Sequence, residues 1–328
     1  MLGAAGAGSC RALVAALAAL VAGLVPRAAG GAETLVVPPR LRLLVVAPHP
    51  DDESLAAGGL MQRVLAAGGR VRVLFITDGD GYPEAVAAAT GRQEPSARDY
   101  RDFGELRRAE ALVALERYHV LPSAVTFLGF PDGGLAAIWR RDPRASAYES
   151  PYTRRDAPPH SLPFETGAHY ERRDLIHLIA RLVASFDPDW IVLPTPLDNH
   201  PDHCATFAFV VEGLKAVAAS KEPGRLLTYL VHASAGWPRA PEEPGPLREP
   251  AVRFAPARWF SVPLDENQAR TKLDALLAHR TQVAVMERVL RSFARPNELF
   301  AVIERAQIAS LAPGTPPCGP QPPSFADP

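Results

Sequence analysis

Residues 43–53 read Leu-Leu-Val-Val-Ala-Pro-His-Pro-Asp-Asp-Glu. The apolar run that opens this stretch predicts a strand covered on both faces, as the strands of parallel sheets are. The run stops at His49, which stands between two prolines, and three acidic residues follow. Because parallel sheets place their ligand sites just beyond the carboxyl ends of the strands, we expect such a site to be lined by His49, Asp51, Asp52 and Glu53.

A second stretch of the same kind lies much later in the chain. Residues 190–194, Trp-Ile-Val-Leu-Pro, predict another buried strand, and residues 198–203 read Asp-Asn-His-Pro-Asp-His. His200 and His203 are three residues apart, so they share one face of a helical turn that begins there. Pro201 is compatible with that first turn, because an N–H at this position would have no helical partner.

Further strands and helices alternate along the chain. The apolar patterns predict strands at 42–47, 71–77, 125–128, 190–194 and 226–231, and helices at 53–67, 104–118, 172–186 and 202–218. This alternation predicts an α/β fold with a doubly wound, mostly parallel, Rossmann-like sheet and helices on both faces. Residues 82–103 are expected to be polar and irregular. The helix at 104–118 is expected to bury a stripe made of Leu106, Ala109 and Val113.

The chain beyond residue 231 is expected to form a small C-terminal β/α extension of the same domain. A strand is predicted at 259–262, and Asp265 with Gln268 forms a capping-box pattern that opens a helix. A last helix follows and ends before Pro296. Residues 34–310 are therefore predicted to form one α/β domain, and the Pro-rich residues 311–328 a disordered tail.

The N-terminus has the pattern of a targeting segment. Arg11 precedes an apolar run over residues 12–25, and small residues follow at 28–32. An apolar core of ~7–15 residues before a small-residue zone is typical of a secretory signal peptide, whereas a spanning helix needs ~20 residues. Residues 1–33 are therefore predicted to be a signal peptide, or a membrane anchor if they are not cleaved. The protein is accordingly expected to be exported, to a periplasmic or extracellular location.

The composition of the chain and the loop after its first predicted strand exclude nucleic-acid binding and dinucleotide binding. The chain has 328 residues, 47% of them hydrophobic, and a formal net charge of −1. That is ample for a core, but it lacks the positive charge that nucleic-acid binding requires. A dinucleotide-binding Rossmann protein would carry G-x-G-x-x-G after its first strand. Residues 47–52 are instead Ala-Pro-His-Pro-Asp-Asp, whose carboxylates would repel a pyrophosphate.

The two polar stretches together supply the ligands of a catalytic metal site. His49, Asp52 and His203 offer two imidazoles and one carboxylate. Such a set holds catalytic zinc at ~2.0–2.2 Å and leaves a position for water. Bound zinc lowers the pKa of that water from ~16 to ~7. Zinc is thus the first expectation, although the same ligands accept other divalent metals such as Fe²⁺.

Neighbouring side chains predict the rest of the chemistry. Asp51 is expected to act as the base that takes the proton of the water. His200 is expected to protonate a leaving amine or to stabilise an oxyanion, and Asp202 to hold His200 in the required tautomer. A structural interpretation of the same residues also remains open, because acidic residues suit a helix N-terminus and can pair with arginines.

At these residues the chain resembles the PIG-L/LmbE-like zinc-dependent de-N-acetylases. That family carries a P-H-P-D-D-E type motif after its first strand and an H-x-D-H motif after a later one. These stand here as residues 48–53 and 200–203. The resemblance covers most of residues 41–235 and implies an LmbE-like fold. It also implies a zinc-dependent amidohydrolase, acting on linear C–N amide bonds, that removes the N-acetyl group from an N-acetylglucosamine-containing glycoconjugate.

The resemblance implies the same roles for the residues of the two motifs, and it adds two residues outside them. Arg107 and Asp132 would contact sugar hydroxyls. Some family members carry a Tyr two residues before the first histidine of the second motif, where this chain has Asp198. The expected partner is an N-acetylated sugar conjugate, with membrane contact only through the N-terminal segment.

Two other functions are compatible with the same residues. One is a non-catalytic glycan-binding protein with a structural metal site, and the other is an O-acetyl esterase that uses the same site. His232 follows the last of the predicted parallel strands and could line the pocket, whereas His279 is interpreted as a surface or core histidine rather than a ligand. The long insertion after the third strand could form a rim on which a sugar stacks, through Trp139, Tyr148, Tyr152 and Tyr170.

Overall fold

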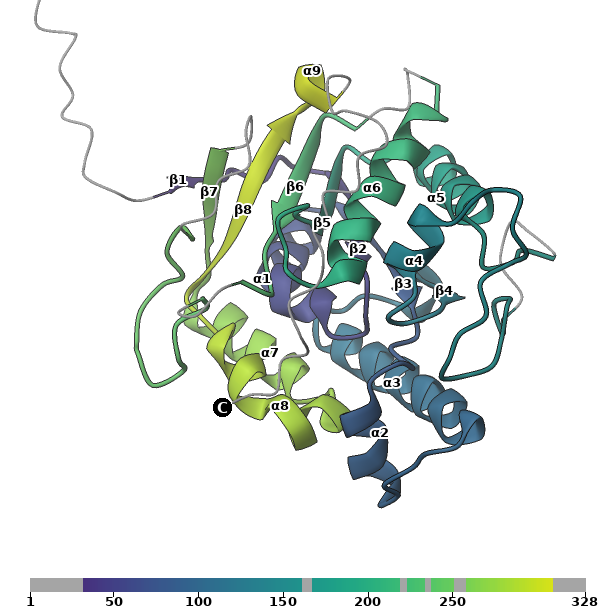
Figure 1. The fold of residues 1–328 in the computed structure, drawn as a ribbon. Helices are drawn as coiled ribbons and strands as arrows, with labels where there is room; N and C mark the ends of the chain where they lie inside the picture. Colours follow the sequence, from purple (N-terminus) through teal and green to yellow (C-terminus); the bar gives the residue numbers. More distant parts are fainter. Residues whose placement is uncertain (1–31, 161–166, 219–222, 234–236, 251–257, 309–328) are drawn as a thin grey trace, which may run out of the picture. The chain divides into compact units, whose positions relative to one another are not determined.

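The computed structural model describes residues 32–160, 167–218, 223–233, 237–250 and 258–308. These residues form one eight-stranded sheet in the order β1-β7-β8-β6-β5-β2-β3-β4, with helices on both faces (Figure 1). The strands are Glu33–Thr34 (β1), Arg42–Ala47 (β2), Arg70–Thr77 (β3), Val125–Phe130 (β4), Trp190–Pro194 (β5), Arg225–Tyr229 (β6), Arg258–Pro263 (β7) and Asn297–Glu304 (β8). The predicted fold class is confirmed.

Strand β2 lies at the point where the direction of winding reverses. It pairs in parallel with β3 on one side, through Val45 opposite Val73, and with β5 on the other, through Val45 opposite Val192. The chain runs outward from β2 to β3 and β4, and it then returns to add β5 and β6 on the opposite side. The carboxyl ends of β2 and β5 therefore meet at a topological switch point, where open parallel sheets bind ligands.

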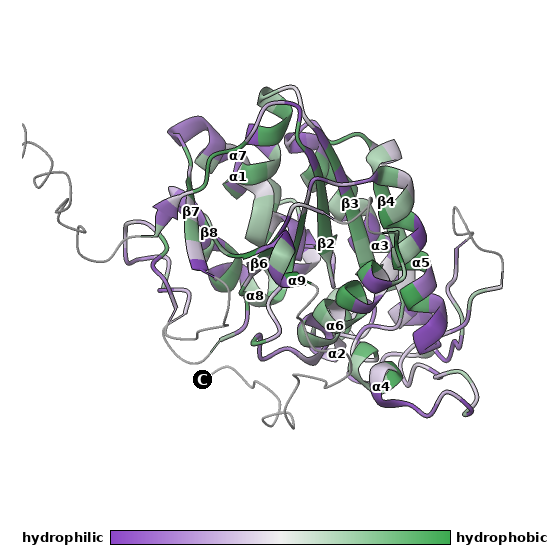
Figure 2. Cartoon of the chain, turned by 90° about the horizontal axis from the view of Figure 1, so that it is seen from above, coloured by the Kyte–Doolittle hydropathy of each residue, from purple (hydrophilic) through white to green (hydrophobic). Residues whose placement is uncertain are grey.

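The residues of each central strand alternate between two hydrophobic cores. Val45 and Val192 pack into the core on one face, whereas Leu44 and Ile191 pack into the core on the other. The central strands are accordingly hydrophobic along their length (Figure 2). The first core includes residues of α1 (Asp52–Ala66), α3 (Ala97–Arg117), α7 (Glu266–Leu276) and α8 (Arg280–Ser292). The second includes residues of α4 (Leu135–Arg140), α5 (Arg172–Phe186) and α6 (Pro201–Lys215).

The region before α3 differs from the prediction. Residues 82–103 were expected to be irregular, but they contain α2 (Pro83–Thr90) and the first turns of α3. Pro83 occupies the first turn of α2, where its missing N–H is harmless. Ser96 and Asp99 form a reciprocal capping box that starts α3 seven residues earlier than predicted. The local start signals were present in the sequence, but the polar composition concealed them.

The predicted buried stripe of α3 is wrong. Leu106 and Val113 are 46% and 45% exposed. The helix instead buries two charged residues, Arg107 and Glu110, together with small apolar ones such as Ala111. The two charged residues bind partners on other elements, and these contacts fix which face of α3 is turned inward.

The C-terminal extension is present and contains a strand that was not predicted. Strand β8 lies between β6 and β7 and pairs antiparallel with both. It therefore continues the main sheet rather than forming a separate layer. The 3-10 turn Pro122–Ala124 and the short helix α9 (Arg305–Ile308) complete the described elements.

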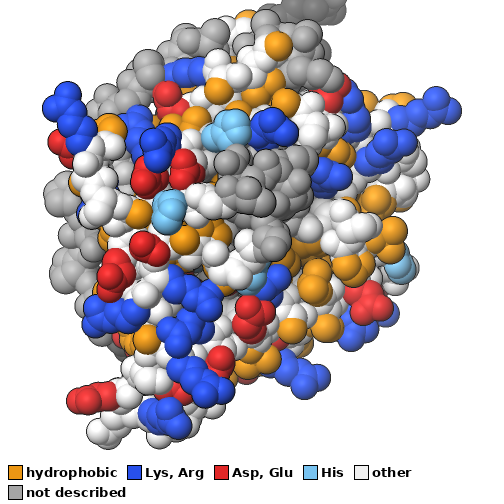
Figure 3. Space-filling model, turned by 90° about the vertical axis from the view of Figure 1, so that its right-hand side faces the viewer, with side chains coloured by type: hydrophobic (Ala, Val, Ile, Leu, Met, Phe, Trp, Pro, Cys, Tyr) orange, Lys and Arg blue, Asp and Glu red, His pale blue; other side chains and the backbone are white. Residues whose placement is uncertain are grey.

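Both predicted terminal segments lie largely outside the described residues. The proposed leader, residues 1–33, overlaps them only at its end, where Glu33 pairs with Phe260 of β7. The predicted tail, residues 311–328, lies wholly outside them. Within the described part of the chain, no helix has the length and apolarity that crossing a bilayer would need. On the face drawn in Figure 3, basic and acidic side chains are interspersed, as the net charge of −1 leads one to expect.

Candidate metal centre and active site

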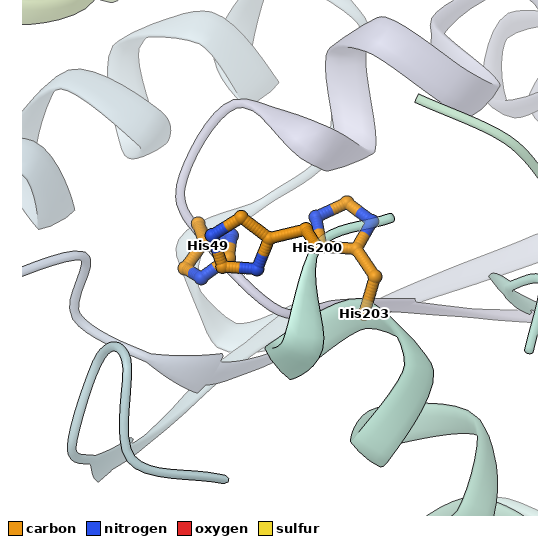
Figure 4. Close-up of side chains that lie close together, drawn as sticks. All are labelled: His49, His200 and His203. Carbon is orange, nitrogen blue, oxygen red and sulfur yellow. The ribbon is translucent and has the colours of Figure 1, made fainter. Parts of the chain in front are cut away.

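Three histidine rings meet beyond the carboxyl ends of β2 and β5 (Figure 4). His49 comes from the loop between β2 and α1, whereas His200 and His203 come from the start of α6. The ring centroid of His49 lies 4.7 Å from that of His200 and 5.4 Å from that of His203. The two polar stretches of the sequence, about 150 residues apart, are therefore brought together as predicted.

The carboxylate of Asp52 lies between two of these rings. Its Oδ2 is 3.2 Å from His49 Nδ1 and 3.2 Å from His203 Nε2. Tetrahedral ligands held ~2.0–2.2 Å from a zinc ion lie about 3.3–3.6 Å from one another, so the two distances from Asp52 are close to those between neighbouring metal ligands. Burial alone would raise the pKa of Asp52, but His203 and His49 hold it well below its usual value.

His203 provides the test of whether a cation fits here. Its side chain is fully buried, and neither ring nitrogen has a hydrogen-bond partner among the described residues. Asp52 and Asp198 lie 3.2 and 3.3 Å from these nitrogens, but without the geometry of a hydrogen bond. Burial would lower the pKa of His203, yet the two carboxylates raise it to about 10. Two carboxylates around a buried imidazole create a negatively charged environment, which a bound cation would neutralise.

More than one combination of these side chains could hold the ion. Among the described residues, three groups each place their ligand atoms within 4.8 Å of one another, and the predicted ligand Asp52 belongs to none of them. They are His49 with His200 and His203, Asp198 with His203 and His232, and His49 with Asp132 and Asp202. His49 and His203 each belong to two of these groups, so they form the centre of the candidate site.

Asp198 connects His203 to the next loop, and the sequence analysis gave it no role. Its Oδ1 lies 3.0 Å from His232 Nδ1, and its Oδ2 accepts hydrogen bonds from the backbone N–H groups of Val231 and His232. The His203 and His232 rings pack edge to face, 4.6 Å apart. A carboxylate behind a metal-binding histidine fixes its tautomer and orientation. The signal was its place in the D-x-H-x-D-H stretch, beside the predicted ligands.

Asp51 occupies a strained backbone position beside the centre. It is the N-cap residue of α1 and has a φ of 136°, in the region that favours glycine. Its N–H donates to Glu53 Oε2 at 2.9 Å, and its Oδ2 accepts from Arg107 Nη2 at 3.1 Å. Burial raises the pKa of Asp51 to about 6, against the opposing effect of Arg107. A carboxylate with this pKa suits general-base chemistry near neutral pH.

Arg107 lies beneath Asp51 rather than at the surface. It is 3% exposed. Its guanidinium also donates to the carbonyl oxygens of Pro50 and Gly79, at 2.7 and 3.0 Å. These contacts hold the β2–α1 loop against the loop that follows β3. The predicted contact of Arg107 with sugar hydroxyls stays a prediction.

Asp132 contacts the metal centre directly. Its Oδ1 lies 3.1 Å from His49 Nε2, and its Oδ2 accepts the N–H of Gly81 at 2.9 Å. Burial would raise the pKa of Asp132, but His49 holds it well below the usual range. Asp132 is thus a charged group at the edge of the site, and its predicted contact with a sugar also remains untested.

The contact between Asp202 and His200 differs from the one we predicted. His200 Nδ1 accepts a hydrogen bond from the backbone N–H of Asp202 at 3.2 Å, not from its carboxylate. The carboxylate accepts the N–H groups of Gly133 and Leu135, at 2.7 and 3.0 Å. The first N–H groups of α4 lack helical partners, and this carboxylate supplies one. The tautomer of His200 is therefore set by the backbone.

The state of His200 follows from that bond. Because Nδ1 accepts a hydrogen bond, the neutral ring carries its proton on Nε2. Burial, with His49 nearby, lowers the pKa of His200 well below 6.5. A neutral ring with a free Nε2–H is suited to donating a hydrogen bond to an oxyanion.

The predicted aromatic rim is only partly present. Trp139 and Tyr170 are 3% and 1% exposed and belong to the hydrophobic core. Tyr148 and Tyr152 are half-buried, and they lie against the Gly133–Gly134 turn that binds Asp202. Two of the four aromatic residues therefore remain candidates for a sugar contact.

Comparison with known proteins agrees with this site. Residues 44–214, which include both motifs, match the PIG-L family, described as GlcNAc-PI de-N-acetylase. A 1D-myo-inositol 2-acetamido-2-deoxy-alpha-D-glucopyranoside deacetylase of Saccharopolyspora erythraea is 30% identical over 264 residues, which cover 76% of this chain and 80% of that protein. An enzyme of the same name from Kineococcus radiotolerans is 29% identical over 269 residues, covering 74% and 69%.

Two solved structures share the fold. The N,N'-diacetylchitobiose deacetylase of Pyrococcus horikoshii aligns with a TM-score of 0.50 at 17% identity, covering 81% of this chain and 85% of that one. A deacetylase of the teicoplanin biosynthesis pathway aligns with a TM-score of 0.51 at 18% identity, covering 80% and 98%. The family match spans more than half of the chain and contains every predicted ligand. The chain therefore belongs to the PIG-L family of de-N-acetylases.

Proposed function

We propose that this protein is a metal-dependent hydrolase that removes the N-acetyl group from an N-acetylglucosamine-containing conjugate. The family membership and the names of the relatives, which act on an acetamido sugar joined to inositol, support this reaction. One observation of the site carries the proposal. The Asp52 carboxylate lies 3.2 Å from both His49 and His203, and the buried nitrogens of His203 lack hydrogen-bond partners in the described chain.

We propose that His49, Asp52 and His203 hold the ion, and that the ion is zinc. Two imidazoles and a carboxylate form the donor set that catalytic zinc favours, although Fe²⁺ would accept it as well. A divalent ion held there would polarise the acetamide carbonyl and make water acidic enough to react near neutral pH. Asp198, behind His203, would keep Nε2 of that ring directed at the ion.

The remaining steps belong to side chains of the protein. Asp51 takes one proton from the attacking water while the oxygen of that water bonds to the acetamide carbon. The Nε2–H of His200 donates a hydrogen bond to the carbonyl oxygen as it gains negative charge. The carbon–nitrogen bond then breaks, and Asp51 returns its proton to the departing nitrogen. The products are an amino sugar and acetic acid, which releases its proton and leaves as acetate. Asp202 acts by presenting its backbone N–H to His200.

Asp132 and Arg107 are proposed to contact the sugar hydroxyls. Asp132 is the better placed, because it is a charged acceptor next to His49. Arg107 can reach a hydroxyl only if it gives up one of its bonds to Asp51, Pro50 or Gly79. Removing each side chain should therefore separate the roles: loss of Asp132 should raise KM, and loss of Arg107 should lower kcat.

We also propose that the protein is exported and meets its conjugate outside the cytoplasm. The basis is the pattern of residues 1–33, a charged residue followed by an apolar run and small residues. Membrane contact would then depend only on whether this segment is retained. Sequencing the N-terminus of protein recovered from cell fractions would decide between cleavage, retention and no export.

The test combines metal analysis with turnover on a panel of N-acetylglucosamine glycosides. We expect about one divalent ion per chain and release of acetate that a chelator abolishes and zinc restores. Asp51→Asn should retain the metal and lose turnover by about 10²-fold or more. Release of acetate that survives both metal removal and Asp51→Asn would contradict the proposal. Sugars acetylated only on oxygen serve as the control, because their preferential cleavage would indicate an esterase.

A further inference from the structure

We infer that His279, from the junction of α7 and α8, is a positioning residue for the catalytic loop. The inference rests on the proposed function, in which Asp51 is the base. His279 is 1% exposed. Its Nε2 lies 3.2 Å from Glu53 Oε1, which is 226 residues away in the sequence. It also lies outside residues 44–214, which carry the family match. Nothing in the two motifs points to it.

The contact matters because Glu53 holds the backbone of Asp51. The N–H of Asp51 donates to Glu53 Oε2 at 2.9 Å. Asp51 has a φ of 136°, a conformation that a non-glycine residue keeps only when its surroundings enforce it. Arg107 enforces it from the other side, through Pro50 O and the Asp51 carboxylate. The strained position of the base is therefore fixed by two buried side chains, Glu53 and Arg107.

Glu53 can do this only if its own carboxylate is fixed. The residue is fully buried, and a buried carboxylate requires donors on the oxygen that does not hold Asp51. Oε1 has two such donors, the Ser54 hydroxyl at 2.6 Å and the His279 ring at 3.2 Å. Ser54 belongs to the same turn of α1, so it moves with Glu53. His279 is the donor that connects this turn to a different part of the fold.

The elements that carry His279 are themselves anchored. Thr281, two residues further, donates its hydroxyl to Glu110 Oε2 of α3 at 2.6 Å. Lys272 of α7 donates to the carbonyl oxygen of Leu55 in α1 at 2.9 Å. Helix α7 lies beside α1 and α3, and α8 lies beside α7 and α2 (Figure 1). His279 therefore connects the catalytic loop to two helices that are themselves held in place by buried hydrogen bonds.

The test compares two substitutions of His279 with a matched control in the metal-loaded full-length protein. His279→Leu removes the donor, whereas His279→Gln can keep an N–H directed at Glu53. Thr281→Val removes only the hydroxyl bond to Glu110. The backbone N–H of residue 281 still donates to Glu110 and keeps the anchor, and Glu53 is untouched. We expect His279→Leu to lower kcat by about 10- to 100-fold with little change in KM or metal content, and His279→Gln to recover most of the loss. Thr281→Val should keep the kcat of the unmodified protein.

A second measurement does not require turnover. Hydrogen–deuterium exchange over residues 49–55 should accelerate in His279→Leu and should match the unmodified protein in Thr281→Val. Equal exchange and equal kcat in all variants would overturn the inference, as would an equal loss in His279→Leu and Thr281→Val. If the unmodified protein has no turnover, the proposed function fails. The exchange rates then still test whether His279 positions the catalytic loop. Faster exchange in His279→Leu alone supports that role, and equal rates in all variants overturn it.

Discussion

Two carboxylates flank the ring of His203, one near each ring nitrogen. Asp52 lies on the Nε2 side of the ring, and Asp198 lies on the Nδ1 side. Both oxygens of Asp198 already accept hydrogen bonds, Oδ1 from the N–H of His200 and Oδ2 from those of Val231 and His232. The side chain is therefore fixed by backbone donors, with its negative charge 3.3 Å from Nδ1 of His203.

This arrangement predicts the effect of Asp198→Asn. The amide would bring an NH₂ group to a position where the protein already directs a donor, and it would remove the negative charge behind His203. We expect metal affinity to fall by about 10- to 100-fold, measured by competition with a chelator of known affinity. Asp189→Asn, at an ion pair with Arg42 on the surface, is the control and should leave the affinity unchanged. Unchanged affinity in Asp198→Asn would contradict the role given to this carboxylate.

His279 predicts a pH dependence of stability. Burial alone would lower the pKa of His279, but Glu53, with a smaller contribution from Asp51, raises it above its ordinary value of 6.5, while Arg107 opposes the rise. A raised pKa in the folded state stabilises the protein fully below about pH 6.5, and the stabilisation is lost as the pH rises through the raised value. The stability difference between the unmodified protein and His279→Gln should therefore shrink with rising pH. Urea unfolding between pH 6 and 9 measures it, and a constant difference would count against the ion pair.

At the scale of elements, a buried ion pair between two other elements binds backbone groups of helix α1. Glu298 of β8 accepts the N–H groups of Gly59 and Leu60, at 2.7 and 2.9 Å. Lys272 of α7 donates to Glu298 at 2.7 Å and to the carbonyl oxygen of Leu55. Leu55 O and Gly59 N are the acceptor and donor of one hydrogen bond in a regular helix, so the two side chains bind at both ends of that bond. The C-terminal extension is thereby joined to the helix that begins at the catalytic loop.

Breaking this pair should be strongly destabilising. Lys272 and Glu298 are both buried, so Lys272→Met would leave a buried carboxylate without its cation. We expect a loss of about 3–5 kcal/mol in the free energy of unfolding. Lys215→Met is the matched control, because Lys215 pairs with Glu212 on the surface at 3.0 Å, and it should change stability by about 0.5 kcal/mol or less. Similar losses in both variants, measured by urea unfolding, would show that burial of the pair has no special effect.

For the whole molecule, the candidate metal site lies between the two halves of the sheet. His49 follows β2 and His203 follows β5, so an ion held by both connects loops on either side of the switch point. A ligand that binds only the folded state stabilises it by about 2.7 kcal/mol at 100 times its Kd. The site should therefore contribute to global stability as well as to chemistry.

Metal removal should lower the thermal stability of the whole domain. We expect a chelator to lower Tm by about 5–10 °C and added zinc to restore it. His203→Ala should show a lower Tm that responds to neither treatment, whereas His169→Gln, at an exposed histidine, should respond like the unmodified protein. A Tm of the unmodified protein that does not change with metal would contradict a resident ion. Differential scanning calorimetry measures these shifts.

The sequence predicted the central strands and the candidate ligands because both can be recognised from residues that are neighbours in the chain. The apolar runs that form β2 and β5 have the lengths of buried strands, and each is followed within a few residues by histidine and aspartate. The parallel-sheet rule then places those residues together. The same local approach failed for α3, where Leu106 and Val113 look like core residues and are exposed. Their exposure follows from buried ion and hydrogen-bond partners of Arg107 and Glu110 that no local pattern reveals.

By itself, the sequence determined the α/β class, the buried central strands and the two motifs that meet at the candidate metal site, because apolar periodicity and short motifs are properties of neighbouring residues. Only the tertiary structure decided how those side chains are oriented. Asp198 is held behind His203 by backbone N–H groups of Val231 and His232, which lie more than 30 residues away in the sequence. His200 is oriented by a backbone N–H, and His279 contacts Glu53 across 226 residues. Such contacts are set by how helices pack on the sheet, and a one-dimensional pattern does not contain that information.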